Sequence, residues 1–212
     1  MTEIRDQLVR GYQSFRRGTF GEQKDLYETL GTKGQFPKVL LLSCADSRVD
    51  PTDIFDAYPG EMFVVRNVAN FMPPRGEEGQ EAGDVAGTAS AVEFAVKALE
   101  VEAIVVMGHE SCGGAAGCLN GLGDMQTDYL GKWVSLLEPA KHAVLARDPE
   151  DPQTEMEYET VRLSMRNLAT YPFVRERMDA GKLELVGAYF SIISAHLKLM
   201  GEDGEFAEVP EA

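Results

Sequence analysis

The sequence predicts an α/β fold in which helices flank a central, mainly parallel β-sheet of four to five strands, preceded by an N-terminal helical arm. Four short, continuous apolar runs are typical of strands buried on both faces, and they span residues 39–44, 62–65, 103–107 and 183–190. Helical patterns separate these runs, at residues 84–99 and across 127–180. Because strands that alternate with helices form parallel βαβ units, these observations together indicate a parallel sheet.

The first thirty or so residues are predicted to form the helical arm. Ile4, Leu8, Tyr12 and Phe15 recur at spacings of three or four residues, which is the period of one helix face. Such a stripe packs either on its own domain or on a partner chain. We therefore expect one domain over residues 1–212, with the arm at 1–34, the catalytic core at 35–200 and a loose acidic tail after Gly201.

Composition and charge exclude several classes of partner. The 212 residues are 44% hydrophobic and 26% charged, which is ordinary for a globular domain. The net charge of −15 disfavours nucleic acid and anionic membranes, which require a basic face. The sequence contains no run of about 18 apolar residues, so no membrane span is expected. The polar stretch from Met1 to Tyr12 does not resemble a signal peptide, so a cytoplasmic location is expected.

The chain has three cysteines, Cys44, Cys112 and Cys118. An odd, small number of cysteines in a chain without a signal peptide does not form a disulfide framework. Metal ligation, catalysis and simple burial remain as explanations for the three cysteines. Cys118 is expected to be a buried small side chain rather than a ligand.

Candidate metal ligands stand where two of the predicted strands end. Cys44 ends the first apolar run, and the third run leads into His109 and Cys112. Functional groups in open parallel sheets gather at the carboxyl ends of the strands. If the two strands are neighbours, these three side chains therefore meet at one edge of the sheet.

Two cysteines and one histidine form a donor set that suits zinc. Three protein ligands leave a fourth position for water or substrate, whereas a structural site is normally closed by a fourth cysteine or histidine. An open, catalytic zinc site is therefore favoured over a structural one.

Asp46 and Arg48 follow Cys44 at intervals of two residues, so all three side chains share one face if the chain stays extended. An arginine next to an aspartate keeps the carboxylate ionised and fixes its orientation. Asp46 can then accept a hydrogen bond from zinc-bound water, or it can occupy the fourth zinc position itself and switch the site off. The sequence leaves both possibilities open.

These residues resemble the motifs of the β-class carbonic anhydrases, and of the plant-type subgroup in particular. The resemblance begins with Cys44-Ala-Asp46-Ser-Arg48 and His109-x-x-Cys112-Gly113. Further similar segments, in the order of the family, are residues 63–70 (FVVRNVAN), 87–96 (GTASAVEFAV), 167–175 (NLATYPFVR) and 187–190 (GAYF).

The resemblance implies a zinc-dependent enzyme that reversibly hydrates carbon dioxide to bicarbonate and a proton, through attack by zinc-bound hydroxide. It implies that Cys44, His109 and Cys112 bind zinc and that Asp46 and Arg48 form a catalytic dyad. It also implies a homodimer or a higher multiple of dimers, with the substrate pocket at the dimer interface. The substrate-binding residues that it implies are Gln35, Phe63, Val68 and Phe94.

Two positions depart from the patterns of the family. Phe94 stands where plant-type members often have tyrosine, so a hydroxyl contact to substrate is lost. Leu41 stands where the bicarbonate-regulated bacterial subgroup has tryptophan. We therefore expect an open site near neutral pH, with Asp46 off the metal.

Two alternatives compete with carbon dioxide hydration. The first is hydrolysis of a related heteroallene, such as carbon disulfide, on the same scaffold. The second is a non-catalytic zinc-binding or thiol-redox module. Cys44 and Cys112 do not form a Cys-x-x-Cys pair, and the Asp46–Arg48 dyad would have no role in such a module, so an enzyme is favoured.

Overall fold

The computed structural model describes residues 2–76 and 86–210. Its helices are α1 (Glu3–Arg17), α2 (Thr19–Glu22), α3 (Lys24–Lys33), α4 (Pro51–Ile54), α5 (Ala86–Lys97), α6 (Gly113–Asn120), α7 (Leu130–Ser135), α8 (Glu138–Arg147), α9 (Pro152–Leu168) and α10 (Pro172–Asp179), with a 3-10 turn, η1 (Val68–Asn70). Its strands are β1 (Val39–Cys44), β2 (Met62–Asn67), β3 (Ala103–His109), β4 (Glu184–Phe190), β5 (Leu197–Met200) and β6 (Phe206–Glu208). The predicted α/β class is confirmed.

The six strands form one sheet in the order β2-β1-β3-β4-β5-β6. The first four strands are parallel, and β5 and β6 extend the sheet in antiparallel fashion. The sheet therefore has more strands than the four to five that the sequence predicts, and part of the expected loose tail is strand β6. Both additional strands are short and lack a continuous apolar run, so their hydrophobic pattern does not reveal them.

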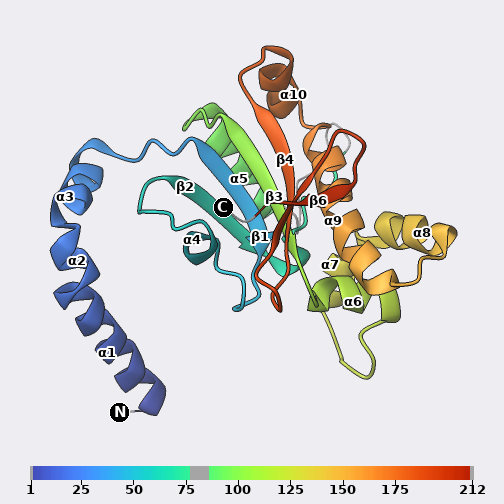
Figure 1. The fold of residues 1–212 in the computed structure, drawn as a ribbon, viewed down its shortest axis with the longest axis horizontal. Helices are drawn as coiled ribbons and strands as arrows, with labels where there is room; N and C mark the ends of the chain where they lie inside the picture. The colour runs from blue at the N-terminus through green and yellow to red at the C-terminus, as the bar shows by residue number, and fades with distance from the viewer. Residues whose placement is uncertain (1, 77–85, 211–212) are drawn as a thin grey trace.

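The main core lies between the sheet and helices α5, α9 and α10 (Figure 1). Leu40, Leu42, Ile104 and Val106 point from β1 and β3 into this core and are fully buried. A smaller cluster around Leu41 and Met107 occupies the opposite face of the sheet, next to α4. Burial on both faces explains why β1 and β3 read as continuous apolar runs rather than alternating patterns.

A second core cluster surrounds the carboxyl ends of β1 and β3 and includes residues of α6, α7, α8 and α9. Helix α9 begins at Pro152, directly after Asp151, whose side chain accepts a hydrogen bond from the Thr154 amide at 3.1 Å. Proline at the first helical position after an aspartate cap is a favoured start for a helix. Helix α9 then passes behind this end of the sheet, in contact with β3 and β4.

The N-terminal residues form the predicted helical arm. Helices α1, α2 and α3 project away from the sheet in Figure 1, and none of their residues is buried. The predicted helix at 84–99 corresponds to α5, but its first two residues, and residues 77–83 of the loop before it, lie outside the described residues. No described helix is long and apolar enough to cross a lipid bilayer.

Candidate metal centre

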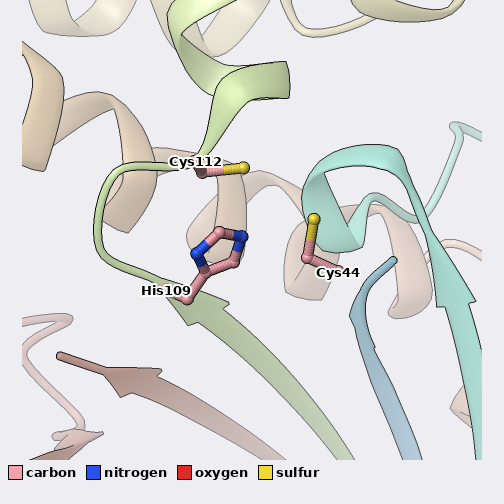
Figure 2. A group of neighbouring side chains, drawn as sticks. All are labelled: Cys44, His109 and Cys112. Atoms are coloured by element: carbon pink, nitrogen blue, oxygen red, sulfur yellow. The ribbon is translucent and has the colours of Figure 1, made fainter. Parts of the chain in front are cut away.

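The three predicted metal ligands meet at the carboxyl edge of the sheet. Cys44 is the last residue of β1, His109 is the last residue of β3, and Cys112 immediately precedes α6. Strands β1 and β3 are parallel neighbours in register, with Ser43 opposite Met107, so their ends project together. The ligand atoms of the three residues lie within 4.8 Å of one another, and Figure 2 shows both sulfur atoms and the imidazole converging on one space.

His109 is oriented for metal binding through Nε2. Its Nδ1 lies 2.8 Å from the carbonyl oxygen of Glu110, which only accepts hydrogen bonds, so Nδ1 carries the proton. Nε2 is buried and has no hydrogen-bond partner among the described residues. A buried polar atom without a partner is costly, and a metal ion that faces this lone pair would remove that cost.

The two neighbouring cysteine thiols shift the pKa of each other in opposite directions. The hydrogen bond from Cys112 is the main cause that lowers the pKa of Cys44 to about 4, and burial acts against it. The same hydrogen bond, together with burial, raises the pKa of Cys112. A divalent cation would displace the remaining thiol proton and hold both sulfurs as thiolates. The donor set, the compact geometry and the orphaned imidazole nitrogen therefore fit a zinc ion.

Asp46 and Arg48 form a bidentate ion pair next to the candidate metal ligands. Arg48 donates from Nε to Asp46 Oδ1 at 2.9 Å and from Nη2 to Oδ2 at 2.7 Å. The Arg48 backbone amide donates to Oδ1 at 3.0 Å. The Arg48 hydrogen bond holds the pKa of Asp46 far below its usual range. Asp46 is therefore an ionised acceptor that faces Arg48, and it does not join the three-ligand group.

Of the predicted substrate-binding residues, Val68 lies closest to this edge. Val68 begins the turn η1, directly after β2. It lies against α6, because a Cβ added to Gly114 would lie 2.7 Å from Val68 Cγ1. Trp133 of α7 donates from Nε1 to the Val68 carbonyl at 2.9 Å. A cavity of about 660 Å³ opens beside Val68, and its lining includes Asn67, Thr88, Tyr129, Trp133 and Leu136.

Gln35, Phe63 and Phe94 are not brought to the metal ligands of their own chain. Phe63 pairs with Leu40 near the start of β1, whereas Cys44 at the end of β1 pairs with Asn67. Four residues of strand separate the two ends by roughly 13 Å. Phe94 packs on Phe63 with ring centroids 5.8 Å apart. Gln35 precedes β1 and is exposed, so it too belongs to the amino-terminal side of this strand.

Two charged residues that support the site were not identified from the sequence. Arg66 of β2 donates to the carbonyls of Cys44 at 2.9 Å and of Asp46 at 2.7 Å, which fixes the loop after β1. Glu157 of α9 is buried and accepts a hydrogen bond from the Cys112 amide at 2.9 Å. Two sequence features could have identified these residues. One is an arginine within an apolar strand, and the other is a glutamate on the core-facing side of a helix.

Comparison with known proteins agrees with this geometry. Residues 39–197 match the model of the carbonic anhydrase family. Beta carbonic anhydrase 3 of Arabidopsis thaliana is 34% identical over 201 residues, which cover 92% of this chain and 76% of that protein.

Solved structures are similar over almost the whole chain. The β-carbonic anhydrase CcaA superposes with a TM-score of 0.89 at 32% identity and covers 99% of this chain and 94% of its own. A tetrameric β-carbonic anhydrase from Sordaria macrospora superposes with a TM-score of 0.81 at 26% identity. The match covers 99% of this chain and 100% of that chain. The matched family model, the similar relatives and the shared fold lead to one conclusion: this chain belongs to the carbonic anhydrase family, in its β-class.

Proposed function

We propose that this protein catalyses the zinc-dependent, reversible hydration of carbon dioxide to bicarbonate and a proton, with Cys44, His109 and Cys112 as the zinc ligands. The observation that carries the proposal is the three-ligand group beside the ionised Asp46–Arg48 pair. Zinc held by three protein ligands acts as a Lewis acid that lowers the pKa of water toward neutrality. The remaining steps depend on the side chains of this chain.

Asp46 orients the attacking water by accepting a hydrogen bond, and Arg48 holds Asp46 in position. Three hydrogen bonds from Arg48 occupy the two carboxylate oxygens of Asp46. Direct binding of Asp46 to the metal would require these bonds to break or rearrange, which favours the open state of the site. A crystal grown at neutral pH with Asp46 bound to zinc would contradict this part of the proposal.

The substrate pocket is shared between two copies of the chain. Val68 supplies an apolar wall next to its own metal ligands. Phe63 of β2, Phe94 of α5, which packs on it, and Gln35 before β1 lie toward the opposite end of the two strands. We place these three residues in the pocket of a second copy, where the aromatic rings contact carbon dioxide and the Gln35 amide donates a hydrogen bond to bicarbonate. The exposed ring of Phe94, 48% accessible, supports such a contact.

The helical arm holds the second copy. Ile4, Leu8 and Tyr12 lie on one face of α1 and are 71%, 70% and 62% exposed, although side chains of this kind are normally covered. The tetrameric relative from Sordaria macrospora supports a homo-oligomer built from dimers. In this arrangement residues 1–212 form one domain, with the arm at 1–34 and the catalytic core at 35–200.

A reducing, cytoplasmic location suits the metal centre. All three cysteines are free, and the sulfurs of Cys44 and Cys112 lie within 4.8 Å of each other. An oxidising compartment would favour a bond between these two thiols, which must remain available as thiolate ligands.

Stopped-flow measurement of carbon dioxide hydration tests the function directly. Zinc-loaded protein is expected to show activity that rises from roughly pH 7 to pH 9, because two thiolate ligands lower the pKa of the water less than imidazoles would. Asp46→Asn should reduce activity at least about a hundredfold while the zinc content is unchanged. Asp53→Asn, an exposed aspartate on α4, is the matched control and should retain activity.

Full zinc occupancy without carbon dioxide hydration at any pH would overturn the proposal. Carbon disulfide would then be the next substrate to test. Equal activity of the Asp46→Asn variant and the unmodified protein would instead remove the role assigned to the dyad.

A further inference from the structure

The peptide unit between Ser111 and Cys112 is held between two side chains of opposite charge. Its carbonyl accepts a hydrogen bond from Arg48 Nη2 at 3.1 Å. Its N–H donates to Glu157 Oε1 at 2.9 Å. Ser111 has a φ of 56°, in the left-handed region that a side chain rarely adopts without support from its surroundings. The turn that carries Cys112 therefore depends on contacts from outside the turn.

Glu157 has three hydrogen-bond partners, all of them donors. Besides the Cys112 amide, Gln153 donates from Nε2 to Oε1 at 2.6 Å, and Tyr189 donates its hydroxyl to Oε2 at 2.8 Å. These three donors stabilise the ionised carboxylate and lower the pKa of Glu157, but burial has the larger effect and the net pKa is raised. With 2% of its surface exposed, Glu157 is a buried carboxyl group that the proposed hydration chemistry does not use.

The two charges select one orientation of the peptide. In the observed orientation the N–H points toward the Glu157 carboxylate and the carbonyl points toward the Arg48 guanidinium. A flipped peptide would direct the carbonyl oxygen at the carboxylate and the N–H at the guanidinium, and both contacts would be repulsive. Arg48 also holds Asp46, so the same peptide links the metal ligand Cys112 to the dyad.

We infer that Glu157 is a positioning residue for the metal centre: its carboxylate locks the Ser111–Cys112 peptide against Arg48 and thereby fixes the Cys112 sulfur and the Asp46–Arg48 pair in one arrangement. This inference rests on the proposed role of Cys112 as a zinc ligand. Groups outside the ligand set that orient the ligands typically change metal affinity tenfold to about a hundredfold when they are removed.

The test compares Glu157→Gln with Glu159→Gln. Glu159 lies on the same helix and is 3% exposed, but its hydrogen bonds go to arginine side chains rather than to the Cys112 turn. Zinc affinity is measured by competition with a chelator. The cobalt-substituted proteins are compared through the thiolate-to-cobalt absorption in the near ultraviolet, which reports the arrangement of the sulfur ligands independently of activity.

Glu157→Gln is expected to weaken zinc binding about tenfold and to shift the cobalt–thiolate absorption. Glu159→Gln should leave both close to their values in the unmodified protein, even though its fold is less stable. Glu157→Gln with unchanged zinc affinity and an unchanged cobalt spectrum would overturn the inference. An equal loss in both variants would also overturn it, because the effect would then come from general destabilisation.

Tyr189→Phe provides a second test if the Glu157 variant does not fold. It removes one donor to the carboxylate but keeps the ring, and it should shift the cobalt spectrum in the same direction by a smaller amount. An unchanged spectrum and unchanged zinc affinity in a folded Tyr189→Phe protein would contradict the inference. Failure of the unmodified protein to bind zinc would instead refute the proposed function, so the two failures are distinguishable.

Discussion

Gly114 controls the distance between α6 and the turn that follows β2. A Cβ at this position would lie 2.7 Å from Val68 Cγ1, 2.8 Å from Ala69 Cβ and 3.3 Å from the Ala69 amide nitrogen. The Ala69 backbone has a φ of 66°, so the turn is already in a left-handed conformation with little freedom to move. A side chain at position 114 would therefore displace the wall that Val68 contributes to the site.

Gly114→Ala is expected to lower the free energy of unfolding by about 1–3 kcal/mol through overpacking. It should also lower kcat/KM for carbon dioxide hydration by about tenfold, because Val68 is displaced from the proposed pocket. Zinc content should be unchanged, since the ligand side chains are not replaced. Gly113→Ala is the matched control, because a Cβ there meets no atom within 4 Å. Equal effects of the two substitutions, measured by stopped-flow hydration, would contradict this explanation.

Only two of the three cysteines belong to the group of side chains that could hold a metal ion. Cys118 is buried, but it is not a member of the ligand group, and burial raises the pKa of its thiol. We expect Cys118→Ser to retain one zinc ion per chain, while Cys44→Ala and His109→Ala lose it, as measured by elemental analysis after dialysis. Loss of zinc from Cys118→Ser in folded protein would show that the ligand set is wrong.

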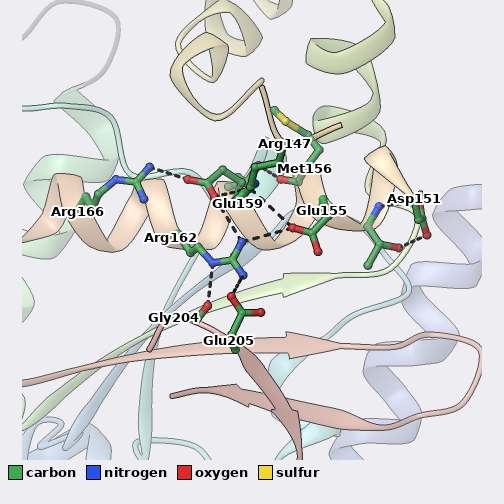
Figure 3. Close-up of polar contacts among 11 residues, drawn as sticks. Arg147, Asp151, Glu155, Met156, Glu159, Arg162, Arg166, Gly204 and Glu205 are labelled. Carbon is green, nitrogen blue, oxygen red and sulfur yellow. Dashed lines mark hydrogen bonds and ion pairs between the residues drawn. The ribbon is translucent and has the colours of Figure 1, made fainter. Parts of the chain in front are cut away.

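At the scale of elements, an ion-pair network centred on the buried Glu159 joins α8, α9 and the turn between β5 and β6 (Figure 3). Glu159 lies at its centre and accepts from Arg147 at 2.9 Å and Arg166 at 2.8 Å, with Arg162 at 3.4 Å. Arg162 also donates to the Gly204 carbonyl at 2.8 Å. Burial acts to raise the pKa of Glu159, but the arginines outweigh it, and the net pKa is lowered.

This network predicts a pH-dependent contribution to stability. Because its pKa is lower in the folded state, Glu159 stabilises the fold above its unfolded pKa of about 4.3, and the contribution disappears as pH falls through the folded pKa. Glu159→Gln should therefore lower the free energy of unfolding by about 2 kcal/mol at pH 7. This value is smaller than for fully buried ion pairs, because Arg147 and Arg166 reach solvent. The difference should shrink under acid conditions.

Urea unfolding of both proteins at neutral and acidic pH measures this effect. Glu102→Gln, which breaks the exposed pair between Glu102 and Lys38, is the control and should cost less than about 1 kcal/mol at either pH. A destabilisation by Glu159→Gln that is the same at both pH values would mean that packing, rather than charge, dominates at this position.

The long elements were predictable from the sequence, whereas the short ones were not. Strands β1 and β3 are buried on both faces, and their continuous apolar runs reveal them. Strands β5 and β6 have four and three residues and include Lys198 and Glu208, so local sequence does not distinguish them from a polar tail. They form by pairing: β5 pairs with the edge of β4, and β6 pairs with β5.

At the scale of the whole molecule, the proposed substrate pocket requires residues from two copies of the chain. The metal ligands and Val68 lie at the carboxyl end of β1 and β2, and the pair Phe63–Phe94 lies toward the amino end. A separated monomer should therefore retain its zinc ligands but lack the residues that a second copy contributes.

Leu8→Glu, on the apolar face of α1, is expected to lower the oligomeric mass and to reduce kcat/KM at least about tenfold, because an added charge opposes burial of the arm. Gln13→Glu adds the same charge on the opposite face of the helix and should change neither quantity. Light scattering and stopped-flow hydration on the same samples check the prediction. A monomeric Leu8→Glu protein with full activity would show that each chain has a complete pocket.

The amino-acid sequence by itself determined the fold class, the donor set and the neighbouring dyad, because apolar runs mark buried strands and the donors directly follow them. Only the tertiary structure decided which side chains meet. It placed the buried Glu157 behind Cys112 and set Phe63 and Phe94 apart from the candidate metal ligands. The physical reason is that strand order and register, which depend on long-range packing, fix these distances, and local residue patterns carry little information about them.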